Sequence, residues 1–304
     1  MFQEVAAKGK NTLPVTVVYA AVMALLAGMT FDGWWKEFVC IIIATFLMVI
    51  INNNNVLIRV YSRLPSSIFL VLAVMLMNRY RSFEADIALV LFAAHLLLLF
   101  RTYQDKQSMG TVCTAFILIG AISTVFMQIL YFVPVIWLLL GTYMQAGSLK
   151  NYAASLAGLL VPYWLWGTYG FCTGNYEYIL EHIASIAVIQ PVDGSILEPH
   201  LLLNTVFISV LGICGAIHFA RYSYQDSIKT RMMFYSLIVL FLLTIVFIAL
   251  QPQYHNYLLR LLAVTAAPIT AHYFTFTKSR FHNCFFIVCI AIAILLTVYN
   301  TWMA

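Results

Sequence analysis

Charged side chains are scarce in this chain of 304 residues, because Asp, Glu, Lys and Arg together make up only 9% of it. Apolar residues make up 63%, and the mean hydropathy is +0.93. A soluble domain of this composition could not hide its apolar surface in one core, whereas a helix bundle surrounded by lipid need not do so. The shortage of charge therefore argues against a soluble globular protein and predicts a membrane protein.

The sequence also lacks the short motifs that identify a chemistry. Its six cysteines form no C-x-x-C pair, and it has no nucleotide-binding, metal or cofactor motif. We therefore predict no metal site, no cofactor and no disulfide framework. The net charge of +5 comes from short loops that anionic headgroups can attract, so membrane lipids are the expected partners and nucleic acid is not.

A cleavable leader is not expected either. Lys8 and Lys10 precede an apolar run over residues 13–31, as in a signal peptide, but an Ala-x-Ala processing site is absent. The run is about 19 residues long, enough to cross about 30 Å of hydrocarbon at 1.5 Å per residue. Met29 stands where a lipoprotein box would require cysteine. We expect this run to be retained as a first membrane helix.

Apolar stretches recur along the whole chain. They cover residues 13–31, 37–52, 65–78, 84–100, 109–126, 128–145, 151–171, 201–220, 232–250, 256–277 and 283–302. They predict an all-α, polytopic transmembrane helix bundle of about 11 spans, with a range of 10 to 12, that forms a single integral membrane domain over residues 1–304. The third stretch is short, and the sixth begins almost where the fifth ends. If either the third or the sixth stretch does not cross the membrane, the orientation of every later span is inverted.

The distribution of charge gives the bundle an orientation. If residue 1 is cytoplasmic, 12 of the 16 Lys and Arg residues fall on the cytoplasmic side and 8 of the 11 acids fall on the other side. Cytoplasmic loops of membrane proteins are enriched in Lys and Arg. The pattern predicts a cytoplasmic N-terminus, an outer C-terminus and a place in the bacterial inner (cytoplasmic) membrane.

One longer segment separates the seventh and eighth stretches. Residues 172–200 contain four acids and no Lys or Arg, which is typical of an outer loop. Tyr176, Ile179, Leu180, Ile183 and Ala187 recur at helical spacing. This spacing predicts an amphipathic helix over residues 176–190 that lies on the outer membrane interface.

The ionisable residues expected at the outer face are the candidates for a site. Arg79, Arg81 and Arg260 could bind a phosphate, because a guanidinium at membrane depth must pair with water, a carboxylate or a phosphate. Glu177 and Glu181 in the outer loop are candidate catalytic bases. The competing interpretation is that these arginines are ordinary charges that reach the interface and pair with nearby acids.

Three histidines fall inside apolar stretches, namely His95, His218 and His272. A neutral imidazole that bonds to a neighbouring helix would explain each of them without any function.

Several segments together resemble an uncharacterised family of polytopic inner-membrane proteins from Bacteroidota. They are Asn52 to Asn55, Arg63-Leu64-Pro65-Ser66, Tyr131-Phe132-Val133-Pro134, Ser148 to Tyr152 and Leu159 to Tyr163. The resemblance covers nearly the whole chain. It implies the fold class and the localisation, but no activity and no catalytic residues.

Three functions therefore stay open. The first is an activity on a lipid-linked saccharide or phosphate at the outer face, with a lipid-linked glycan as partner. The second is a transporter or flippase that uses proline-kinked helices and His95 or His272. The third is a non-catalytic scaffold in envelope assembly, which needs none of these residues.

Overall fold

A computed structural model of the chain describes residues 2–28, 33–77, 82–174, 176–187 and 199–302. Every element of regular structure in these ranges is a helix, so the predicted all-α class is confirmed. The chain divides into two compact units: unit 1 consists of residues 1–89 and 193–304, and unit 2 of residues 90–192.

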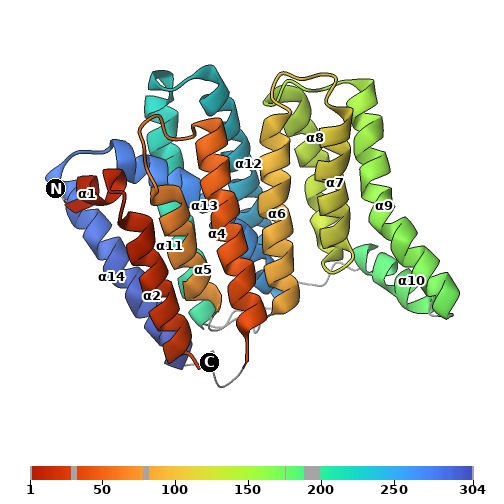
Figure 1. Cartoon of the computed structure of the whole chain (residues 1–304), viewed down its shortest axis with the longest axis horizontal. Helices are drawn as coiled ribbons and strands as arrows, with labels where there is room; N and C mark the ends of the chain where they lie inside the picture. The colour runs from red at the N-terminus through yellow and green to blue at the C-terminus, as the bar shows by residue number, and fades with distance from the viewer. Residues whose placement is uncertain (1, 29–32, 78–81, 175, 188–198, 303–304) are drawn as a thin grey trace. The chain divides into compact units, whose positions relative to one another are not determined.

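Unit 1 is built around one buried helix. Its elements are α1 (Phe2–Lys8), α2 (Thr12–Leu26), α4 (Trp35–Asn55), α5 (Leu64–Met77), the start of α6 (Phe83–Arg101), α11 (Pro199–Tyr222), η4 (Ser223–Gln225), α12 (Ile228–Leu250), η5 (Pro252–Tyr254), α13 (His255–Phe276) and α14 (Arg280–Trp302) (Figure 1). Every residue of α13 from Leu258 to Thr275 is buried. The helix packs against α5, α11 and α12, so α13 is the core of the unit.

The sequence of α13 suits this central position. The hydroxyls of Thr265 and Thr275 donate to backbone carbonyls one turn earlier, which satisfies these polar groups inside the helix. Pro268 lies within the helix and has no N–H to donate, which frees a backbone carbonyl one turn earlier. Gly215 of α11 allows close approach, because a Cβ there would lie 2.7 Å from the carbonyl oxygen of Ile269.

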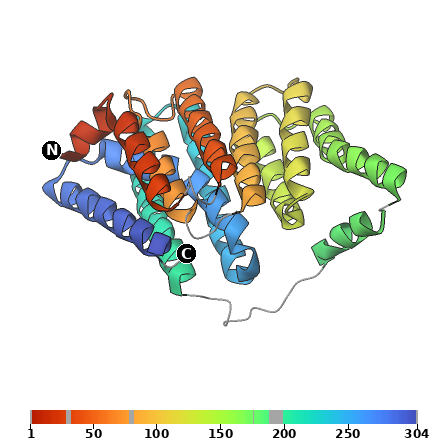
Figure 2. The ribbon, with the colours of Figure 1, turned by 60° about the horizontal axis from the view of Figure 1, so that its bottom comes forward.

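Unit 2 is a smaller helical group. It contains the rest of α6, then α7 (Met109–Ser123), η1 (Met127–Phe132), α8 (Val133–Thr142), α9 (Leu149–Thr173), α10 (Tyr176–Ala184) and η2 (Ser185–Ala187) (Figure 2). Helices α7 and α9 pack closely because glycines line their contact: a Cβ on Gly120 would lie 2.8 Å from the carbonyl oxygen of Leu159.

Each of the eleven expected stretches overlaps described helical structure, although the stretches over residues 13–31 and 65–78 end outside the described ranges. By length and composition, five helices could cross a membrane, namely α4, α6, α11, α12 and α14, and a sixth follows if α1 and α2 form one span despite their 96° bend. Helices α5 and α7 and the segment Met127–Thr142 are apolar but shorter, and α9 and α13 are long enough but are not among the candidate spans. The sixth stretch is divided into η1 and α8, with Pro134 in the first turn of α8. A total of about 11 spans stays a prediction.

Basic side chains gather at one end of unit 1. Figure 1 shows that the turns from α4 to α5, α11 to α12 and α13 to α14 lie together with α1. We refer to this as the basic end, and its Lys and Arg residues are Lys8, Lys10, Arg59, Arg63, Arg221, Lys229, Arg231, Lys278 and Arg280. The opposite end, the acidic end, carries Lys36, Glu37, Glu84, Asp86 and Arg260, while Glu4 and Asp226 lie at the basic end. Basic residues thus outnumber acids at the basic end, and the orientation of the unit in a membrane stays a prediction.

The amphipathic stretch after α9 is helical over its described part. Helix α10 and η2 cover residues 176–187, and residues 188–190 lie outside the described ranges. The ring Nε2 of His182 lies 2.8 Å from the carbonyl oxygen of Ser123, which attaches α10 to the end of α7. The placement of this helix at a membrane interface stays a prediction.

Candidate functional site

The buried helix α13 carries an ionisable side chain near each end. Arg260 lies in its second turn and His272 lies one turn before its last residue, and only 3% and 1% of these residues are exposed. Burial of a charged or polar group away from water is costly unless the group is paired. The partners of these two side chains therefore define what each end of α13 can do.

At the acidic end, the partner of Arg260 is a carboxylate. Its Nε donates to Oδ1 of Asp86 across 2.6 Å, and only 1% of the Asp86 side chain is exposed. Asp86 lies in the first turn of α6, where the helix dipole favours a negative charge. Nη1 of Arg260 donates to the backbone carbonyl of Asn256 across 2.9 Å and also to the Asn256 side-chain oxygen.

A second contact joins the same two helices close by. The hydroxyl of Tyr257, at the start of α13, donates to Oε2 of Glu84 across 3.1 Å. Helices α6 and α13 are thus held together at the acidic end by one buried ion pair and one more exposed hydrogen bond.

The candidate residues of the outer-face site have different positions. Arg79 and Arg81 lie outside the described residues. Of the partners expected for Arg260, the structure places a carboxylate beside it, so a phosphate would have to compete with Asp86 for the guanidinium. Glu177 and Glu181 are exposed on α10, which belongs to unit 2, whereas Arg260 belongs to unit 1.

At the basic end, the partner of His272 is also a carboxylate. Its Nε2 lies 3.0 Å from Oδ2 of Asp226, and 2% of each side chain is exposed. Asp226 belongs to the turn between α11 and α12, at the end of η4. The pair therefore connects the end of α13 to this turn.

Arg59 extends the pair to the surface. Its Nη1 lies 3.8 Å from Oδ1 of Asp226, and 40% of the Arg59 side chain is exposed. The guanidinium donates to the backbone and side-chain oxygens of Gln225, both across 2.8 Å, and lies over the ring of Phe276 at 4.3 Å. A continuous polar path thus runs from the buried His272 to water.

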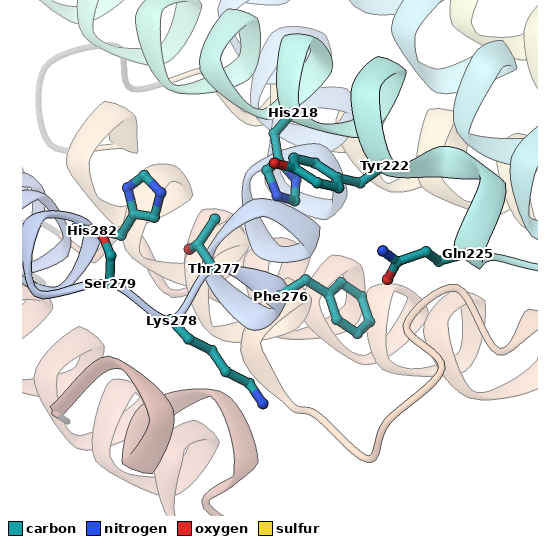
Figure 3. Close-up of a pocket in the computed structure, with 8 residues that line it drawn as sticks. All are labelled: His218, Tyr222, Gln225, Phe276, Thr277, Lys278, Ser279 and His282. Carbon is teal, nitrogen blue, oxygen red and sulfur yellow. Dashed lines mark hydrogen bonds between the residues drawn. The ribbon is translucent and has the colours of Figure 1, made fainter.

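A pocket of about 280 Å³, lined by both polar and apolar atoms, opens beside this path. Figure 3 shows its lining side chains. Three come from α11 and the turn that follows it, namely His218, Tyr222 and Gln225. Five come from the end of α13 and the start of α14, namely Phe276, Thr277, Lys278, Ser279 and His282.

His218 links the pocket to the buried pair. Its ring centroid lies 5.9 Å from that of His272 and 4.8 Å from that of Tyr222. Its Nδ1 is buried and has no hydrogen-bond partner among the described residues. Within unit 1, a row of neighbouring groups therefore leads from the pocket through His218 and His272 to Asp226.

The third histidine, His95, lies in unit 2 and packs between two helices, with its Nε2 buried and without a hydrogen-bond partner among the described residues. Nδ1 of His95 lies 2.9 Å from the carbonyl oxygen of Ala115 on α7, and its ring packs against Phe92 and Phe116. The expectation of a histidine bonded to a neighbouring helix is confirmed here. For His272 the partner is a buried acid instead.

The partners themselves were not predicted from the sequence. Of these partners, Asp226 is the one that its sequence position singles out, because it is an acid between the basic residues Arg221 and Lys229. An acid at the basic end needs a cation or a hydrogen-bond donor nearby. The pocket residues Lys278 and His282 gave no such signal, because both are ordinary polar residues of a short turn.

Comparisons with known proteins supply no residue roles for this site. No protein-family model matches the chain, and neither does any curated protein or solved structure. Among the described residues, no group of three or more His, Cys, Asp or Glu side chains has the geometry to hold a metal ion.

Proposed function

We propose that the chain is an integral protein of the bacterial inner membrane, with about 11 spans, a cytoplasmic N-terminus and an outer C-terminus. The basic end of unit 1 then faces the cytoplasm, as the positive-inside rule requires. The apolar helices and the separation of charge between the two ends of unit 1 support this topology. We also propose that the chain belongs to the uncharacterised family of polytopic inner-membrane proteins from Bacteroidota that its sequence resembles.

Within this frame, we propose that the protein is a transporter for a polar solute, with a pathway along α13. One observation carries the proposal: α13 is buried over its length, yet it has a buried pair with a carboxylate near each end. Ionisable groups inside a membrane bundle are costly and rare, and they are a default indication of a substrate or ion pathway. A scaffold would gain no stability from these buried ion pairs that well-packed apolar side chains could not supply.

The middle of α13 is consistent with such a pathway. Pro268 frees a backbone carbonyl, and the Thr270 hydroxyl is buried without a hydrogen-bond partner among the described residues. Broken or kinked helices with free backbone groups line the binding sites of many transporters. These groups lie between Arg260 and His272 and could contact a polar solute in transit.

Uptake into proteoliposomes tests this proposal. The purified protein is reconstituted, incubated with a soluble metabolite extract of bacterial cells, washed, and the trapped compounds are identified by mass spectrometry. We expect at least one polar compound to accumulate above protein-free liposomes, and Asp226→Asn to reduce its uptake about tenfold, because the variant loses the buried charge that pairs with His272. Asp105→Asn is the matched control, because Asp105 is exposed and belongs to unit 2.

Two results would contradict the proposal in different ways. If wild-type proteoliposomes trap nothing that empty liposomes do not trap, the protein is not a transporter of soluble solutes. If Asp226→Asn and the control transport equally well, the pair at the basic end is not part of the pathway.

A second candidate function is the handling of a lipid-linked saccharide or phosphate at the outer face. The position of Arg260 at the acidic end, opposite the basic loops, favours it. If this candidate is correct, Arg260→Lys should abolish turnover of a radiolabelled lipid-linked pyrophosphate saccharide, because lysine lacks the planar set of donors of a guanidinium. The abundance of the protein should stay normal. Full turnover by Arg260→Lys and Arg260→Ala rules this candidate out.

A further inference from the structure

We infer that the pocket at the basic end of unit 1 binds a phosphate group. The inference deepens the proposed transport function, because it names the chemical class of the solute at the cytoplasmic mouth of the pathway. It rests on the donors that line the pocket, on the helix that begins there and on its size.

The donors come first from the turn between α13 and α14. Lys278 contributes an ammonium group with three hydrogens. Oγ of Ser279 accepts a hydrogen bond from the backbone N–H of His282 across 3.2 Å, so its own hydroxyl hydrogen is available to a ligand. A cation beside a hydroxyl donor is a common arrangement for holding phosphate oxygens.

Helix α14 adds a positive potential. Ser279 caps it through two bonds, because its backbone oxygen also accepts from the N–H of Asn283 across 3.1 Å. The helix continues for 23 residues from Arg280, so its dipole is fully developed and its positive end lies at the pocket wall. A helix start of this kind favours an anion.

The opposite wall adds an imidazole, which can donate from the ring nitrogen that carries the proton, and no acid. His218 lines the pocket with a buried Nδ1 that lacks a hydrogen-bond partner among the described residues. The described lining residues include no carboxylate, and the nearest acid on the path, Asp226, is already paired with His272 and Arg59. The pocket therefore combines the donors of Lys278 and Ser279 with a wall that has no carboxylate among its described lining residues.

The size limits the ligand. A volume of about 280 Å³ is at the small end of ligand pockets, which run from about 300 to 1,000 Å³. It admits inorganic phosphate, a phosphate ester of a few carbons, or the phosphate of a lipid headgroup that enters from the inner leaflet.

The test measures binding independently of transport. The protein is purified in a non-ionic detergent, and its thermal unfolding midpoint is followed against inorganic phosphate, glycerol phosphate and a short-chain phosphatidic acid, with chloride at matched ionic strength as the reference. A ligand that binds only the folded state raises the midpoint in proportion to its affinity. We expect at least one of these phosphates to raise the midpoint of the wild type.

Two variants locate the effect. Lys278→Gln should weaken the apparent Kd about tenfold, because it removes a charge-assisted contact, and Ser279→Ala should weaken it about threefold. Lys150→Gln is the matched control, since Lys150 is an exposed lysine of unit 2 and does not line the pocket. Lys278 and Ser279 are both exposed, so these changes leave the core intact.

Each outcome decides the matter. Stabilisation by the soluble phosphates that is weaker in Lys278→Gln and Ser279→Ala assigns the pocket to a soluble ligand, whereas stabilisation by phosphatidic acid alone, weakened in the same variants, assigns it to a lipid headgroup. No stabilisation of the wild type, or equal stabilisation of all variants, overturns the inference. If phosphate binds but proteoliposomes take up nothing, the phosphate pocket stands and the transport proposal falls. If proteoliposomes accumulate a solute but no phosphate stabilises the wild type, the transport proposal stands and the phosphate pocket falls.

Discussion

The buried pair between Arg260 and Asp86 makes a quantitative prediction. Both side chains are at least 97% buried, so solvent screens their interaction little. Removal of one partner leaves the other as an unpaired group in an apolar interior, which costs about 3 kcal/mol or more. Replacement of both partners by apolar residues of similar volume removes that penalty and leaves only the loss of the Asn256 contacts, about 1 kcal/mol.

A double-mutant cycle measures this pair directly. We expect Arg260→Met and Asp86→Leu each to lower the free energy of unfolding by about 3 kcal/mol and the double variant to lower it by about 1 kcal/mol, so the coupling is about 5 kcal/mol. The assay is unfolding of the purified protein in mixed micelles by titration with a denaturing detergent, followed by far-UV circular dichroism. Native helicity of each variant in mild detergent is the control.

The size of the coupling decides the interpretation. Side-chain hydrogen bonds between membrane helices average about 0.6 kcal/mol, because the unfolded state in a membrane also finds partners. A coupling of that size would show that the pair is solvated or exchanged with other partners, and it would refute the reasoning from burial. A large coupling would leave Arg260 mainly occupied by Asp86 and would weaken the outer-face phosphate site.

Two further predictions concern topology and packing. A reporter fused after Ala304 should be active only outside the cytoplasm, and a reporter fused near Ser227 should be active only inside it. If both reporters give the opposite result, the predicted orientation is inverted. If only one of them does, the predicted number of spans is wrong. Gly215→Ala should destabilise the protein by about 1–3 kcal/mol, because the new Cβ would lie 2.7 Å from the carbonyl oxygen of Ile269. Thermal unfolding in detergent measures this effect. An unchanged unfolding midpoint would mean that α11 and α13 are further apart than this distance implies.

The helices of this protein could be predicted from the sequence, because apolar runs and turn residues are local features. The run over residues 232–250 is part of α12 (Ile228–Leu250), and the run over residues 37–52 is part of α4 (Trp35–Asn55). The sequence could not tell which helices are central. Helix α5 is almost entirely buried and only 22% of the apolar window of α14 is buried, yet both are apolar throughout. Lipid and protein interior are equally apolar, so hydropathy does not distinguish them.

The site was harder to predict than the fold for a related reason. Asp86 and Arg260 are 174 residues apart in the chain, and Asp226 and His272 are 46 apart. Spacing within one helix says nothing about such pairs, because they depend on which helices become neighbours. Because burial of an ionisable side chain is costly, an Arg or His embedded in a membrane must have a partner. It identifies Arg260 and His272 as residues to explain, and only the packing of α13 supplies the explanation.

The two pairs on α13 differ in a way that bears on transport. The acidic-end pair is closed, with 3% and 1% of its side chains exposed, whereas the basic-end pair continues through Arg59, which is 40% exposed, and lies beside a pocket. If the proposed transport function is correct, a solute that enters from the basic end would meet His218 and His272 first and Arg260 last. Its passage to the acidic end would then require Arg260 and Asp86 to separate. Under that proposal the Arg260–Asp86 pair would act as a barrier, and its coupling free energy would set part of the cost of opening it.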